Sequence, residues 1–80
     1  PYPNPFNPNT NIWLTIYQKS DVDISIFNIV GEKTSNIYKG SLGLGSHKFN
    51  WNASTFPSGI YFVYYNIQGK VFSKKLILIK

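Results

Sequence analysis

The chain is 80 residues long and carries a net charge of +5, with eight lysines, no arginine and no cysteine. Disulfides and thiolate metal sites are therefore excluded, and specific nucleic-acid binding is disfavoured because its bidentate contacts rely on arginine. No apolar run reaches the roughly 18 residues that cross a bilayer, so we expect no direct membrane insertion.

The first ten residues, PYPNPFNPNT, contain four prolines, which forbid a helix and discourage a central strand. A disordered linker would have no need of Tyr2 and Phe6, and the asparagines suit turns that bond back to the backbone. We therefore expect an ordered lead-in over residues 1–10, with Phe6 largely buried, followed by a folded region over residues 11–80.

After the lead-in the dominant period of the sequence is two, which is typical of strands with one buried face. In the first such segment Ile12, Leu14 and Ile16 fall on one face. Gly31 marks a tight reversal that needs positive φ. A glycine-rich loop is expected at residues 39–46. The expected strands lie at residues 11–17, 22–29, 33–38, 47–51, 60–67 and 71–80.

This pattern predicts one all-β domain over residues 1–80, an antiparallel sandwich of about seven short strands. The segment 60–67 is β-branched and aromatic on both faces, so it belongs in the middle of a sheet. Nothing in the chain suggests a helix or an internal repeat.

Few residues in the sequence point to catalysis or to a bound cofactor. His47 is the only histidine and Glu32 the only glutamate, so we predict no catalytic residue, no cofactor and no bound metal. Asp21 and Asp23 are separated by one residue at the start of a strand, so their side chains point to the same face. Together they offer two oxygens to Ca²⁺, which requires about six to eight. A solvated turn is the simpler explanation for the pair.

The aromatic residues allow two interpretations. They form either a flat platform that stacks sugar rings or the filling of a cysteine-free core, and the core is favoured because a thin two-sheet interior needs such rings. The six rings concerned are Trp13, Tyr17, Trp51, Tyr61, Tyr64 and Tyr65.

The end of the chain is apolar at four consecutive positions, Leu76 to Ile79, with Lys74 and Lys75 before them and Lys80 after them. Such a strand is either covered on both sides within its own sheet or keeps one face for a partner that docks along its edge. The sequence pattern alone leaves both possibilities open.

Five segments taken together resemble the type IX secretion C-terminal sorting domain of Bacteroidetes-like bacteria. They are YPNPFNPNT, SIFNIVGEK, GSHKFNWNA, PSGIYFVYY and KKLILIK, and they cover essentially the whole chain in order. The chain is also similar to the related Ig-like domain of flagellar hook-capping proteins. The resemblance implies an Ig-like sandwich whose structural motif comprises Pro3, Asn4, Pro5, Phe6, Gly31, Gly59 and Tyr61. Ala53 departs from the family pattern, which often has glycine there.

The resemblance implies a sorting function that acts through protein–protein recognition and not through catalysis. The expected partners are the type IX translocon, an outer-membrane shuttle protein and a sortase-like peptidase, with the chain as a monomeric domain of a larger exported protein. Such a protein passes through the periplasm and reaches the outer-membrane surface or the medium. The expected partner-binding residues are Lys74, Lys75, Leu76, Ile77, Leu78, Ile79 and Lys80. The alternatives are a structural Ig-like spacer and a carbohydrate-binding module of a secreted hydrolase.

Overall fold

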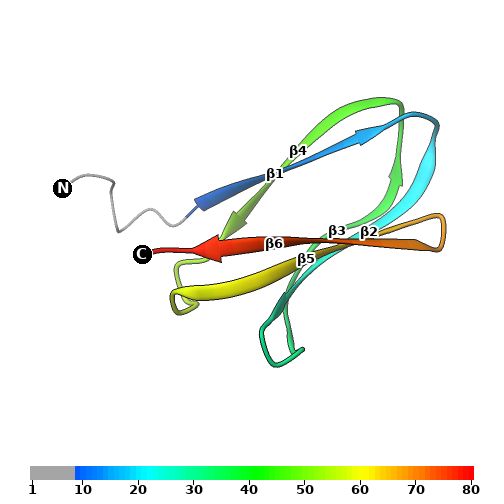
Figure 1. Ribbon diagram of the computed structural model, residues 1–80. Helices are drawn as coiled ribbons and strands as arrows, with labels where there is room; N and C mark the ends of the chain where they lie inside the picture. The colour runs from blue at the N-terminus through cyan, green and yellow to red at the C-terminus, as the bar shows by residue number, and fades with distance from the viewer. Residues whose placement is uncertain (1–8) are drawn as a thin grey trace.

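The computed structural model describes residues 9–80, and all regular structure in that part of the chain is β. Six strands follow one another, joined by short turns and loops (Figure 1). They are β1 (Asn9–Ile16), β2 (Ser20–Asn28), β3 (Lys33–Leu42), β4 (Gly45–Asn52), β5 (Gly59–Ile67) and β6 (Lys70–Leu78). The expectation that Phe6 is buried, like the motif positions Pro3, Asn4 and Pro5, lies outside the described residues.

The strands form two antiparallel sheets that pack as a sandwich. One sheet has two strands in the order β1-β4, and the other has four in the order β3-β2-β5-β6. The predicted all-β antiparallel class is confirmed, with six strands in residues 9–80 where about seven were expected. The apolar strand β5 lies between β2 and β6, as its two apolar faces predicted.

The core lies between the two sheets and is built from the alternating apolar rows of the strands. Ile24 and Ile26 of β2 are fully buried at its centre. Alternation predicted this inward row, as it predicted the inward row of β1. Other buried apolar residues are Ile12, Ile16, Val22, Leu42, Trp51, Ala53, Tyr61, Val63, Tyr65 and Leu78.

The glycine-rich segment expected to be a loop at residues 39–46 is mostly strand. β3 continues to Leu42 and β4 starts at Gly45. The ring of Tyr38 lies over Gly40, where an added Cβ would come within 3.2 Å of the tyrosine oxygen, and that hydroxyl donates to the Ser41 carbonyl at 2.7 Å. Gly40 therefore serves the close packing of a side chain within a strand and does not break the strand.

Two hairpin turns fix the register of the larger sheet. Gln68 and Gly69 both have positive φ and join β5 to β6 as a two-residue loop, the geometry that matches the twist of paired strands. Gly31 has a φ of 89° in the β2–β3 turn, which confirms the positive φ expected there. None of the described residues belongs to a helix that could span a membrane.

Candidate recognition surface along the last strand

The last strand, β6, lies at an edge of the four-stranded sheet. Within residues 9–80 it pairs only with β5, in a regular antiparallel register from Ile67–Lys70 to Gly59–Leu78. One side of β6 thus keeps backbone N–H and C=O groups that no other described strand uses. The sequence left open whether this strand is covered on both sides within its sheet or lies at an edge. In the structure β6 lies at an edge.

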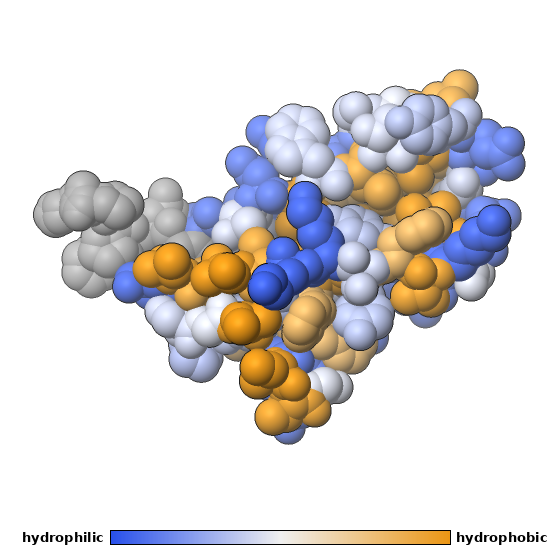
Figure 2. Space-filling model, in the orientation of Figure 1, coloured by the Kyte–Doolittle hydropathy of each residue, from blue (hydrophilic) through white to orange (hydrophobic). Residues whose placement is uncertain are grey.

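The four consecutive apolar residues at the end of β6 divide between core and surface. Leu78 is 4% exposed and Leu76 is partly buried against the core. Ile77 and Ile79 are 58% and 83% exposed. The apolar run therefore anchors the strand through one row of side chains and presents the other row to solvent, where Figure 2 shows apolar surface at the chain's end.

The two lysines before the apolar run also point to opposite faces. Lys74 pairs in register with buried Val63, so it belongs to the inward row, and Lys75 pairs with Phe62 on the outward row. Both lysines are exposed. Polar surface along the middle of β6 separates apolar patches near its two ends (Figure 2).

Lys80 is attached to the loop between β4 and β5. Its Nζ donates to the carbonyl of Phe56 at 2.6 Å and to that of Ser54 at 2.8 Å. Its backbone N–H donates to Oγ of Ser58 at 3.0 Å. These three bonds hold the end of β6 in place, so Lys80 contributes to the shape of the candidate surface as well as to its charge.

The motif residues Gly59 and Tyr61 organise the same end of the molecule. Gly59 is the first residue of β5 and pairs with Leu78. Tyr61 is buried, its hydroxyl donates to the Pro57 carbonyl at 2.6 Å, and its ring packs edge-on against Trp51 with centroids 5.2 Å apart. A tyrosine bonded to the backbone a few residues upstream in this way fixes the corner of a sandwich.

Gly31 belongs to a separate turn that is bonded through Asn28. The Gly31 N–H donates to the Asn28 carbonyl, and Oδ1 of Asn28 accepts from the N–H groups of Val30 and Glu32. The turn presents Ile29 and Val30 to solvent. This turn and the loop Phe56–Gly59 line a cavity of about 250 Å³.

The sequence analysis gave no indication of the partners of Lys80. The bonds join positions 22 to 26 residues apart, and the acceptors in the β4–β5 loop are mainly backbone carbonyls. Every residue type has such a carbonyl, so no pattern in the sequence could have marked them.

Comparison with known families places the chain in one of them. The model of the family described as "Secretion system C-terminal sorting domain" matches residues 1–80. The chain belongs to this family. No curated protein and no solved structure matches it. As a sorting domain of type IX secretion, it directs export across the outer membrane and interacts with the machinery of that system.

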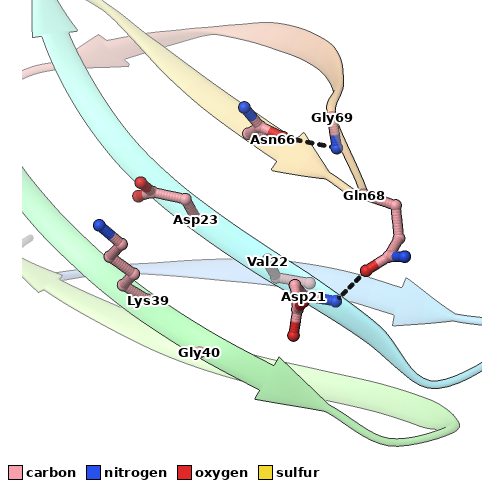
Figure 3. A pocket seen from close by; sticks show the side chains of 8 residues that line it. All are labelled: Asp21, Val22, Asp23, Lys39, Gly40, Asn66, Gln68 and Gly69. Carbon is pink, nitrogen blue, oxygen red and sulfur yellow. Dashed lines mark hydrogen bonds between the residues drawn. The ribbon is translucent and has the colours of Figure 1, made fainter.

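The sorting domain has an open depression at the start of β2, which includes the aspartate pair considered for Ca²⁺ (Figure 3). Nδ2 of Asn36 donates to Asp23 at 2.8 Å, and Gln68 accepts from the backbone N–H of Asp21 at 2.6 Å. Among the described residues no third His, Cys, Asp or Glu joins the two carboxylates, and Lys39 lines the same depression. Ca²⁺ requires about six to eight oxygens, so two carboxylates beside a lysine do not by themselves make a calcium site.

The six aromatic residues of the sorting domain do not share one surface. Trp51, Tyr61 and Tyr65 are buried in the core, as the favoured interpretation held. That interpretation is wrong for Trp13, Tyr17 and Tyr64, which are exposed. Trp13 lies on the outer face of the smaller sheet, with the Lys48 ammonium 5.7 Å from its ring centroid, while Tyr64 lies on the outer face of the larger sheet against Phe27. A single flat platform of these six rings is absent.

His47 of the sorting domain lies in β4, just after the connection from β3. A ring nitrogen, Nε2, lies 2.8 Å from the Gly43 carbonyl, and the ring stacks beside Phe49. The imidazole is half-buried and contacts the backbone of the connection between β3 and β4.

Proposed function

We propose that the sorting domain is recognised through the free edge of β6 from Leu76 to Ile79, flanked by Lys75 and Lys80. The receptor is an outer-membrane shuttle protein of the type IX translocon, which adds a strand to this edge. Main-chain hydrogen bonds then supply affinity, and pockets for alternate side chains supply selectivity. The domain acts by recognition and not by catalysis.

The observation that carries this proposal is that the residues of the apolar run alternate between the core and the surface. Leu78 is buried and fixes the strand, whereas Ile77 and Ile79 are exposed beside an unused backbone edge. Large apolar side chains on an open edge are an aggregation hazard unless a partner uses them. The bonds from Lys80 to the β4–β5 loop support the proposal further, because a held strand loses less conformational freedom on binding.

The same proposal covers the route of the cargo. The exported protein crosses the periplasm after Sec export, and the translocon moves it across the outer membrane. A sortase-like peptidase then removes the sorting domain and joins the cargo to a surface lipopolysaccharide. The support for these steps is membership of the family.

The experiment compares two exposed apolar residues of β6. Ile77 and Val71 are 58% and 57% exposed, and both lie on the outward row of the same edge strand. In a cargo fusion that a type IX system exports, Ile77→Asp is expected to leave the cargo in the periplasm. Val71→Asp is the matched control and is expected to be exported like the wild type. Cell fractionation and surface labelling measure the outcome.

Two controls separate recognition from folding. Thermal unfolding of the purified domain shows whether Ile77→Asp and Val71→Asp are equally stable. Deletion of residues 76–80 is expected to retain all of the cargo in the periplasm. Normal surface display of the deleted fusion, or equal export of a folded Ile77→Asp variant, would show that the β6 edge is not the recognised surface.

A further inference from the structure

The two sheets of the sandwich do not cover one another completely. β4 faces β3, since Nε1 of Trp51 donates to Oγ of Ser35 at 3.0 Å and the rings of Tyr38 and Phe49 lie 5.2 Å apart. β1 is left on the side of β5 and β6. The start of β1 and the end of β6 lie at the same end of the molecule, and in the view of Figure 1 the two strands diverge toward the opposite end. The first half of β6 therefore has no described strand above it.

An open groove of about 490 Å³ occupies the space between these diverging strands. Ile16 from the end of β1, Ile67 and Phe72 line it, with Lys70 beside them. Phe72 pairs in register with buried Tyr65 and so belongs to the inward row of β6. It is nevertheless 54% exposed, whereas Leu78 of the same row is 4% exposed. The groove is thus a part of the core that remains uncovered.

Strand β1 also has no described partner strand on the side that faces the groove. Within residues 9–80, β1 pairs with β4 alone. In an antiparallel edge strand, alternate residues direct their N–H and C=O groups away from the partner strand. A strand laid against β1 on this side would extend the smaller sheet to three strands and cover Phe72.

The charges around the groove restrict which strand can enter. Lys70 and Lys74 occupy the inward row of β6 on either side of Phe72. None of the three acidic residues of the chain lines the groove. Inward-pointing lysines repel an apolar or basic strand, whereas acidic residues at the facing positions complement them. A second copy of this chain, with its net charge of +5, is a poor match.

We propose that the groove between β1 and β6 binds an extended polypeptide segment of the pattern acidic–x–apolar–x–acidic, as an added strand beside β1. The spacing of two matches the positions of Lys70, Phe72 and Lys74 along one row. The apolar side chain packs on Phe72 and Ile16, and the two carboxylates reach the two ammonium groups. This site uses a different strand edge from the one proposed for the translocon and does not depend on that proposal.

The test measures binding of a short peptide to the 80-residue chain by fluorescence anisotropy. The probe is a labelled, end-blocked peptide of sequence Thr-Glu-Thr-Leu-Thr-Glu-Thr, and the same peptide with lysine in place of glutamate is the control ligand. The double variant Lys70→Glu/Lys74→Glu is expected to weaken binding about fivefold or more. Lys33→Glu/Lys48→Glu changes net charge equally at exposed positions away from the groove and is expected to keep wild-type affinity.

Phe72→Ala tests the apolar contact and is expected to weaken binding by a similar factor, with circular dichroism confirming that the variant is folded. Amide chemical shifts of the wild type are expected to change along β1 and at residues 70–74. If the two double variants weaken binding equally, binding depends on net charge and not on the lysines beside the groove, and the proposal is overturned. No binding at millimolar peptide, shifts confined to residues 76–79, or self-association through the groove in sedimentation would also overturn it.

Discussion

The ammonium of Lys80 donates to the Phe56 carbonyl at 2.6 Å and ties the last residue of the chain to the loop that precedes β5. The same loop holds Tyr61 through the Pro57 carbonyl. The end of β6 and the start of β5 therefore form one bonded unit. The β6 edge that we propose as the recognition surface is held there by contacts that are distant in sequence.

Removal of the Lys80 ammonium is expected to loosen this unit. Lys80→Met removes two hydrogen bonds to exposed carbonyls, so the free energy of unfolding is expected to fall by only about 0.5 kcal/mol. Amide hydrogen exchange at residues 76–79 is expected to accelerate more clearly, because those residues lose their attachment. Lys75→Met removes an exposed lysine of the same strand and is the control. Equal exchange in the two variants would show that the Lys80 bonds do not hold the strand.

Replacement of Gly31 tests the β2–β3 turn. Its φ of 89° is unfavourable for a residue with a Cβ, although an added Cβ would meet no atom within 4 Å. Gly31→Ala is therefore expected to lower the free energy of unfolding by about 1–2 kcal/mol through backbone strain alone. Gly43→Ala is the matched control, since its surroundings are equally open and its φ lies outside the left-handed region. Urea denaturation measures both, and similar losses in the two variants would contradict the expectation.

The hydroxyl of Tyr61 tests the corner of the sandwich. Tyr61→Phe keeps the buried ring against Trp51 but leaves the Pro57 carbonyl without its donor, so a loss of about 1–1.5 kcal/mol is expected. In a domain of this size such a loss lowers the melting temperature by roughly 4–8 °C per kcal/mol. Tyr64→Phe, on the outer face of the same strand, is expected to change the melting temperature by less. A Tyr61→Phe variant as stable as Tyr64→Phe would show that the corner bond contributes little.

The alternation of apolar residues was sufficient to predict the fold class and the inward rows of β1 and β2, because a period of two leaves one face to bury. It could not predict the extent of β3. Glycine at residues 40, 43 and 45 suggested a loop, whereas the Tyr38 ring covers Gly40 and the strand continues to Leu42. Local composition does not report which side chain packs over a glycine.

The candidate site was predicted in part. The apolar run and its flanking lysines left two outcomes open for the last strand, a covered strand or a surface for a partner, because strand order depends on long-range pairing. Only the pairing of β6 with β5 alone makes it an edge. The groove beside β1 was not predicted, since Phe72 becomes exposed only because β1 diverges from β6.

Burial of Tyr65 in the core gives the domain a sensitivity to alkaline pH. Desolvation raises the pKa of Tyr65 above 10.0, because the tyrosinate charge would lose its hydration in the core. The folded chain thus keeps this proton when the unfolded chain has already released it. The stability linked to Tyr65 is therefore complete below about pH 10. It is lost as the pH rises beyond the pKa that Tyr65 has in the unfolded chain.

Urea midpoints measured between pH 8 and pH 11 test this expectation for Tyr65. Tyr65→Phe removes the ionisable hydroxyl, so its midpoint is expected to fall less steeply above pH 10 than that of the wild type. Tyr64→Phe removes a hydroxyl from the neighbouring, exposed position of β5 and controls for general effects of the substitution. If all three proteins lose stability with the same slope, ionisation of Tyr65 is not coupled to unfolding.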